Sequence, residues 1–176
     1  MNKFLITTLL LVFSSSFFFA QTNEVLKERA LRDAKIASKA TLEGDYKTVL
    51  KHTYPTVVEM MGGTAKATEI IKSMFAEMGE QGFVFEKADV QFVSDVVFEQ
   101  NEYRCYTQSM NVMKMNNMRI NSKSYLFGFY DAEKEYWYFV EAAKMKNTEL
   151  MDQLFPDFQT NMLVPEAEMD MEEIKD

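Results

Sequence analysis

The apolar residues of this chain change their spacing at Gly82. Before this glycine they recur every third or fourth residue, which is the period of one face of an α-helix. After it, apolar and polar residues alternate, which is the period of one face of a β-strand. A chain that places its helices before its strands folds as an α+β protein, because the strands pair with one another and the helices cover the sheet. The spacing therefore predicts N-terminal helices packed on a strongly curved antiparallel sheet.

Three helices are expected before Gly82, over residues 23–41, 45–54 and 64–78. Each begins at a side chain that accepts hydrogen bonds from the first backbone N–H groups of a helix, namely Asn23, Asp45 and Thr64. Residues 56–61, between the second and third helices, are short and apolar and look extended. The third helix is expected to bury one apolar face, made of Ile70, Ile71, Met74, Phe75 and Met78.

The strands that follow are expected over residues 83–93 with 96–98, 102–115, 118–130 and 135–143. Asn116 and Asn117 suit a two-residue hairpin turn, because asparagine tolerates a positive φ. A short last helix is expected over residues 148–154. No repeat or Pro/Ser-rich linker divides the chain, so residues 23–163 are predicted to form a single domain.

Residues 1–20 have the pattern of a secretory signal peptide. Lys3 supplies the positive start, an apolar run follows over residues 4–13, and Ala20 stands at the expected cleavage point. A retained membrane anchor is the alternative. The apolar run is shorter than the roughly 20 residues of a spanning helix and is followed by three serines, which favours cleavage. We therefore expect an exported protein, periplasmic or secreted, with no membrane attachment after cleavage.

The charge balance argues against nucleic acid as a partner. The chain has 27 acidic and 19 basic residues, for a formal net charge of −8, and residues 164–176 are rich in Asp and Glu. Such a chain repels nucleic acid and anionic membranes. Residues 164–176 are expected to be an acidic disordered tail. With one histidine and one cysteine, no intrachain disulfide and no two-histidine metal site is possible, and no cofactor is expected.

Residues 44–75, GDYKTVLKHTYPTVVEMMGGTAKATEIIKSMF, carry a resemblance to a known family. In their element order and their Gly-Gly turn they resemble the front half of the nuclear-transport-factor-like superfamily, which includes SnoaL-like and ketosteroid-isomerase-like proteins. The resemblance covers about residues 25–144. It implies a cone-shaped, cystatin-like fold whose strands surround a pocket, and dimers formed through the sheet. It implies no activity, since the family's pocket acid or histidine dyad has no identifiable counterpart here.

Strand alternation predicts which side chains share a face of the sheet. A turn at Asn116-Asn117 and a five-residue loop over residues 131–135 would align one set of alternating residues across three strands. That face would hold Arg104, Tyr106, Gln108, Tyr125, Phe127, Phe129, Trp137, Phe139 and Glu141. It is a candidate lining for a pocket that binds a small apolar or amphipathic molecule, with Glu141 beside Tyr125 as a possible proton acceptor. The alternative is that the aromatic residues pack on the helices while Glu141 and Arg104 pair at the rim.

Methionines gather at the predicted hairpin. Met113, Met115 and Met118 would share one face near the turn, and three thioethers form a soft site of the kind that Cu(I) prefers. The alternative is that methionine serves as adaptable filler of the core and of contact surfaces. Lone His52 is expected to be a helix C-terminal partner or a core histidine.

Together these patterns favour a binding domain over an enzyme, with no catalytic residues assigned. The preferred ligand is a small apolar molecule, and copper binding at the methionines is one alternative. The other is a protein-interaction module or homodimer that uses the opposite sheet face, made of Ser109, Ser122, Ser124, Leu126 and Tyr138.

Overall fold

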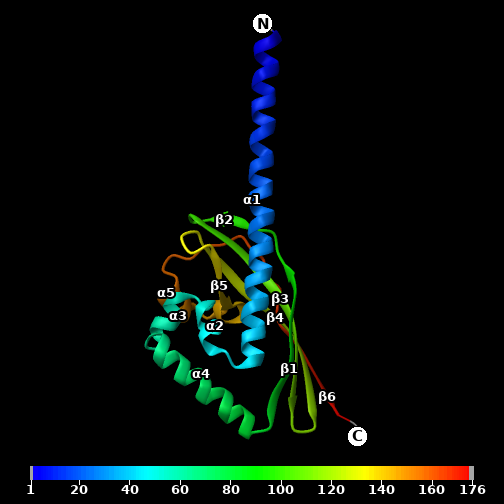
Figure 1. Ribbon diagram of the computed structural model, residues 1–176, viewed down its shortest axis with the longest axis vertical. Helices are drawn as coiled ribbons and strands as arrows, with labels where there is room; N and C mark the ends of the chain where they lie inside the picture. Colours follow the sequence, from blue (N-terminus) through cyan, green and yellow to red (C-terminus); the bar gives the residue numbers. More distant parts are fainter. Residues whose placement is uncertain (1, 175–176) are drawn as a thin grey trace.

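The helices of this protein lie against a six-stranded antiparallel sheet that is not closed, which makes the fold α+β as the sequence predicts (Figure 1). The computed structural model describes the backbone of residues 2–174 and the side chains of residues 23–147 and 149–174. The predicted signal peptide lies outside the residues with described side chains. Within the described residues, no helix combines the length and the apolar character needed to cross a membrane.

The helices and strands follow the predicted order along the chain except at α3 and β6, where an extended segment and a disordered tail were expected. The helices are α1 (Asn2–Glu43), α2 (Tyr46–Lys51), α3 (Pro55–Met60), α4 (Gly63–Glu80), the 3-10 helix η1 (Ala142–Lys146) and α5 (Thr148–Leu154). The strands are β1 (Phe83–Val93), β2 (Val97–Glu99), β3 (Glu102–Met115), β4 (Met118–Asp131), β5 (Tyr136–Glu141) and β6 (Glu168–Glu173).

Local signals explain where α2 and α3 begin. Asp45 caps α2, because its carboxylate accepts hydrogen bonds from the Thr48 backbone N–H at 3.2 Å and the Thr48 hydroxyl at 2.6 Å. The segment predicted to be extended is instead helix α3. Pro55 occupies its first turn, where a missing N–H costs nothing, and the Tyr54 carbonyl accepts the first backbone hydrogen bond from Val57.

The predicted buried face of α4 is only partly covered, with Ile71, Phe75 and Met78 half-buried. Ile70 and Met74 keep 42% and 47% of their surface accessible, and only Ala67 of this helix is buried. The helix contacts α2, α3 and β1 but does not lie flat on the sheet. Its one aromatic contact with the sheet is Phe75 against Phe85, with ring centroids 5.6 Å apart. Periodicity therefore identified the apolar face of α4 but not whether anything covers it.

The hairpin of β3 and β4 has the predicted register. Asn116 has a φ of +53°, and Met115 lies opposite Met118, Gln108 opposite Tyr125 and Arg104 opposite Phe129. The sheet order is β1-β3-β4-β5, with β2 extending the β1 edge along β3 and β6 paired with β4. The two-residue turn is sufficient to set this register, as expected for a hairpin with asparagine at positive φ.

The register predicted for β4 and β5 is wrong by one residue. Phe129 lies opposite Tyr138 and not Trp137, and Glu141 lies opposite Leu126 and not Tyr125. The cause is Asp131, which remains in the strand while its carboxylate accepts the backbone N–H groups of Glu133 and Lys134. These bonds close a loop one residue shorter than expected. A shift of one residue moves every side chain of β5 to the other face of the sheet.

Part of the segment expected to be a disordered tail forms strand β6. It pairs with residues 118–123 of β4, the stretch of that strand that β5 does not reach. Asn117 accepts a backbone hydrogen bond from Ile174, and Lys123 forms an ion pair with Glu168 at 3.1 Å. Because unpaired backbone groups remain along this half of β4, the acidic segment gains ladder hydrogen bonds there despite its charge.

The outer edge of β5 is hydrogen-bonded by the helical half of the chain. The Asp33 carboxylate on α1 accepts the Trp137 backbone N–H at 2.9 Å, and the His52 ring donates from Nδ1 to the Trp137 carbonyl at 3.0 Å. Phe139 donates its backbone N–H to the His52 carbonyl at 2.7 Å and accepts one from Tyr54 at 3.1 Å. These four bonds satisfy an edge that would otherwise be open.

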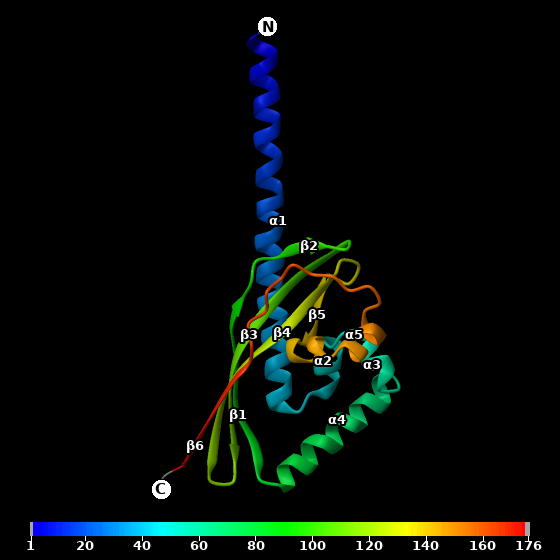
Figure 2. The same ribbon diagram turned by 180° about the vertical axis from the view of Figure 1, so that it is seen from behind.

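Each face of the sheet carries its own core. The face toward α1 buries Trp137, Cys105 and Phe139 against small residues of the helix, Ala30 and Ala34. The other face is covered by the chain that follows β5, as Figure 2 shows. This second core consists of Phe127, Phe129, Val140, Met151, Leu154 and Phe155. The two faces are therefore already covered by different parts of the chain.

We expect Asp33→Ala to lower the free energy of unfolding by about 1–3 kcal/mol, because it leaves the buried Trp137 N–H without an acceptor. Asp33→Asn keeps an acceptor oxygen and should lose less. Urea unfolding followed by the fluorescence of Trp137, the one tryptophan of the chain, measures both. Equal stability of the alanine and asparagine variants would contradict this role for Asp33.

Gly128 lies where β4 passes between β3 and β5, and a Cβ there would meet Cys105 Sγ at 3.1 Å and Trp137 Cε3 at 3.2 Å. We expect Gly128→Ala to destabilise the protein by about 1–3 kcal/mol through overpacking. Gly79→Ala is the control: nothing lies within 4 Å of its Cβ position on α4. That substitution should be neutral or slightly stabilising, since alanine is the better helix former. Urea unfolding compares the stability of the two variants. A Gly128→Ala variant as stable as the wild type would contradict the crowding at this position.

Candidate functional site

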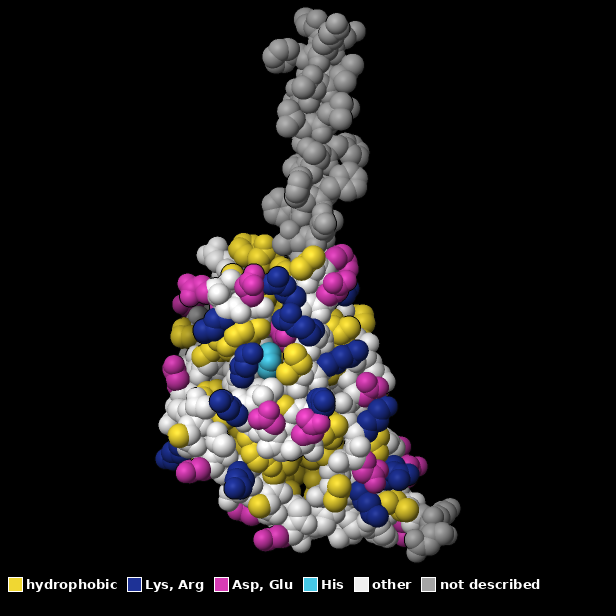
Figure 3. All heavy atoms as spheres, in the orientation of Figure 1, with side chains coloured by type: hydrophobic (Ala, Val, Ile, Leu, Met, Phe, Trp, Pro, Cys, Tyr) yellow, Lys and Arg dark blue, Asp and Glu magenta, His cyan; other side chains and the backbone are white. Residues whose placement is uncertain are grey.

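A cavity of about 840 Å³ lies between the helices and the sheet. Its walls come from α1, α2, α3, α5 and strands β1, β3, β4 and β5. In Figure 3, the face of the molecule beside α4 is hollowed and hydrophobic side chains gather around the hollow. The apolar lining residues are Ala37, Val49, Val57, Met60, Met61, Phe85, Ala88, Met113, Leu126, Phe139, Val140, Leu150 and Leu154.

The space exists because short side chains face one another where α1 crosses the sheet. Ala37 and Ser38 on α1 lie across the cavity from Ser109 and Ser122 on the strands, and none of these side chains reaches far. The Ser38 hydroxyl donates to the Ala88 carbonyl at 2.7 Å, which holds α1 to β1 at this point. Helix α4, which carries longer apolar side chains, does not fill the gap.

Polar side chains line both walls of the cavity. Those of the helical wall include Ser38, Thr41 and Thr53, whose hydroxyls donate to backbone carbonyls, and the others lie mainly on the sheet. Ser109 lies opposite Ser124 and Asn111 opposite Ser122, so four small polar residues form one patch on β3 and β4. We call these four residues the polar floor. The Asn111 side-chain amide donates to the Ser124 hydroxyl at 2.8 Å. Hydrogen-bonding groups are thereby presented inside a mainly apolar cavity, which is the usual composition of a small-molecule site.

Three ionisable side chains line the cavity, and each one already has a partner. His52 is buried, donates from Nδ1 to the Trp137 carbonyl and packs edge-on against Tyr136. A carbonyl oxygen only accepts hydrogen bonds, so the Nδ1 atom carries a proton. Glu141 is half-exposed and forms an ion pair with Lys144 at 3.5 Å.

The structure separates the residues predicted to share one lining. Phe139 and Glu141 reach the cavity, while Trp137 lies in the core beneath α1. The other predicted residues occupy the opposite face of the sheet, because β5 is shifted by one residue relative to the expected register. They are Arg104, Tyr106, Gln108, Tyr125, Phe127 and Phe129. The expected contact of Glu141 with Tyr125 as its cross-strand neighbour is therefore wrong, and so is a rim pair between Glu141 and Arg104.

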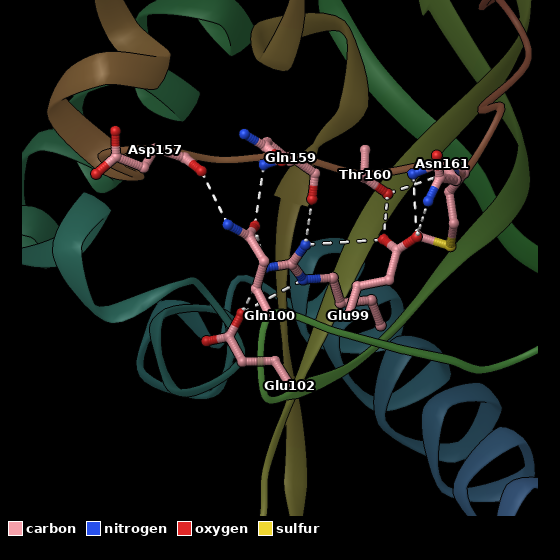
Figure 4. Close-up of polar contacts among 9 residues, drawn as sticks. Glu99, Gln100, Glu102, Asp157, Gln159, Thr160 and Asn161 are labelled. Atoms are coloured by element: carbon pink, nitrogen blue, oxygen red, sulfur yellow. Dashed lines mark hydrogen bonds and ion pairs between the residues drawn. The ribbon is translucent and has the colours of Figure 1, made fainter.

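Arg104 attaches the C-terminal segment to the sheet. Figure 4 shows the surrounding polar contacts of Gln159, Thr160 and Asn161. Its guanidinium is 3% exposed, donates to the Gln159 carbonyl at 2.8 Å and forms an ion pair with Glu102 at 3.0 Å. The ring of Phe158 stacks on it, with 4.7 Å from the Arg104 Cζ atom to the ring centroid. A buried guanidinium needs such partners, so the role of Arg104 here is structural.

Glu99 and Gln100 complete this attachment. The Glu99 carboxylate accepts the Thr160 hydroxyl at 2.6 Å and the Asn161 backbone N–H at 3.0 Å, and both bonds lower the pKa of Glu99 below its usual range. Gln100 donates to the Asp157 carbonyl at 2.8 Å and accepts the Gln159 N–H at 2.9 Å. Glu99 and the turn between β2 and β3 therefore hold residues 157–161, which cover the second core and which we call the C-terminal strap.

The three methionines proposed for copper lie on one face of the β3–β4 hairpin. Met115 and Met118 are directly opposite each other, while Met113 lines the cavity. No group of three His, Cys, Asp or Glu side chains able to hold a metal occurs among the residues whose side chains are described. Cys105 is buried beneath α1, and burial raises the pKa of its thiol, which disfavours the thiolate that would bind metal. Copper binding stays a prediction.

The residues expected to form an outer dimer face mostly line the cavity instead. Ser109, Ser122, Ser124 and Leu126 point toward the helices, whereas Tyr138 lies on the opposite face beside Tyr54. The alternation of β3 and β4 correctly grouped the first four residues. It carried no information on which group the helices would cover, and so the actual lining was missed.

No model of a protein family and no curated protein sequence matches this chain.

Acidification is expected to release the C-terminal strap first. Because the folded state lowers the pKa of Glu99, its stabilising contribution is complete above the unfolded value of about 4.3 and is lost as pH falls through the folded value. Amide exchange of residues 157–161 should accelerate, relative to β4, between pH 5 and pH 3. Glu99→Gln should flatten this pH dependence, and Glu28→Gln, on the exposed side of α1, should leave it unchanged. Equal pH dependence in both variants would contradict the assignment.

Proposed function

We propose that this protein binds a small apolar or amphipathic molecule in the cavity between its helices and its sheet. The observation that carries the proposal is the cavity itself: about 840 Å³, with a mainly apolar lining and polar side chains on both its sheet wall and its helical wall. Ligand sites in proteins have volumes of roughly 300–1,000 Å³ and this same composition.

The surroundings of the cavity support entry of an apolar ligand. Met60 lines the cavity and is half-exposed, and the exposed apolar side chains of α4, Ile70 and Met74, lie on a neighbouring helix. Methionine side chains are flexible and polarisable, so they adapt to ligands of different shape. Exposed apolar residues grouped on one side of a molecule are typical of binding surfaces.

We place the protein with the nuclear-transport-factor-like superfamily as part of this proposal. Support comes from the run over residues 44–75 and from an arrangement in which N-terminal helices cover one face of an antiparallel sheet and leave a cavity between them. Export to the periplasm or the medium is likewise proposed, from the signal-like pattern of residues 1–20.

The test is to fill the cavity from its sheet wall. Ser122→Phe places a large ring inside it. Asn121→Phe, at the preceding residue of β4, places the same ring on the other face. Binding of the uncharged fluorescent dye N-phenyl-1-naphthylamine to the purified protein is measured by titration. The wild type and Asn121→Phe should bind it, and Ser122→Phe should bind at least tenfold more weakly, about 1.4 kcal/mol in binding free energy.

Urea unfolding of each variant shows whether it is folded, and Ala37→Phe fills the cavity from the α1 wall if Ser122→Phe proves unstable. Loss of dye binding in either folded variant supports the proposal. A wild type that binds no dye, or dye affinity unchanged by both cavity substitutions, would overturn it.

A further inference from the structure

The polar floor of the cavity contains hydroxyl groups that the protein leaves without partners. Ser109 and Ser122 stand diagonally across the β3–β4 ladder and are only 7% and 8% exposed. Asn111 is bonded to Ser124, but neither the Ser109 nor the Ser122 hydroxyl forms a hydrogen bond with another described residue. Both hydroxyls keep surface that is accessible from the cavity, since Thr107 Oγ1 is the one enclosed side-chain polar atom without a partner among the described residues. Each can therefore hydrogen-bond to a polar group that enters the cavity.

Apolar side chains continue from the polar floor in both strand directions. On the side toward the hairpin turn, Met113 follows Asn111 along β3, and it lies opposite Phe85 of β1. On the other side, Leu126 follows Ser124 along β4, opposite Glu141 and diagonal to Phe139 of β5. A ligand that fills this space therefore meets hydrogen-bonding groups at one point of its length and apolar surface beyond them.

The charges of the lining determine the kind of polar group that fits. Glu141 and Lys144 are the charged residues among those that line the cavity, and they neutralise each other at 3.5 Å. Both are exposed at the rim. A carboxylate or ammonium group held at the polar floor would lose its hydration without gaining an opposite charge, which is strongly unfavourable. An uncharged hydroxyl, ester or amide loses far less.

From these hydroxyl groups and charges we propose that the ligand is an uncharged amphipathic molecule. Its hydroxyl, ester or amide group hydrogen-bonds to Ser109 and Ser122, and its alkyl or ring portion fills the apolar part of the cavity. This inference rests on the proposed function and specifies the chemical class of the ligand. The inference excludes free fatty acids, whose carboxylate is charged at neutral pH.

The experiment compares two ligands of equal chain length, decan-1-ol and decanoate, as competitors of bound N-phenyl-1-naphthylamine at pH 7.5, where decanoate is anionic. The wild type should bind decan-1-ol at least tenfold more tightly than decanoate. In the double variant Ser109→Ala/Ser122→Ala, decan-1-ol should bind at least fivefold more weakly while the affinity for the dye stays within twofold. Ser73→Ala, an exposed serine on α4, is the matched control and should leave all three affinities unchanged.

Stability gives a second readout. Because the two hydroxyls have no protein partner, the double alanine variant should be at least as stable as the wild type in urea. Absence of dye binding to the wild type would overturn both the proposed function and this inference. If Ser122→Phe abolishes dye binding, the proposed function holds, and two results would then overturn the ligand class alone. One is equal affinity of the wild type for decanoate and decan-1-ol. The other is an affinity for decan-1-ol that is unchanged in the double alanine variant.

Discussion

The hydrogen bonds along the outer edge of β5 are the constraint on which the rest of the structure depends. An edge strand that carries Trp137 and Phe139 cannot leave its backbone groups unpaired in a dry core. Asp33 and His52 supply the partners, together with the backbone of Tyr54, and in doing so they set the positions of α1 and of the α2–α3 connection relative to the sheet. The cavity is the space left between these fixed walls. Its shape therefore depends on the edge of β5 as much as on the residues that line it.

The second constraint is that the two faces of the sheet are covered by different parts of the chain. The aromatic face of β3 and β4 is closed by the segment after β5, which Arg104 and Glu99 hold through buried and partly buried polar contacts. With that face filled, the open space lies on the side of α1, where small residues meet serines. The position of the cavity on the serine face thus follows from the closure of the aromatic face.

Sequence reasoning succeeded where the controlling interaction is local. The Asn116-Asn117 turn sets the β3–β4 register within two residues, and Asp45 marks the start of α2 with its own side chain. It failed at β5, because the carboxylate of Asp131 and the positive φ of Glu135 decide the loop length, and a loop of either length is compatible with the alternation of apolar residues. It also failed for α4, whose apolar face has the helical period whether or not it is covered.

The α+β class, most of the helices and strands, and the pairing of β3 with β4 can be predicted from the sequence, since helical and strand periods and turn residues act over a few positions. Only the tertiary structure decided which face of the sheet is covered by which segment, the pairing of β6 with β4, and the presence of the cavity. Those features arise from contacts between residues far apart in the chain, such as Asp33 with Trp137 and Arg104 with Gln159. Alternation along a strand divides side chains into two groups, but only packing decides which group faces the helices.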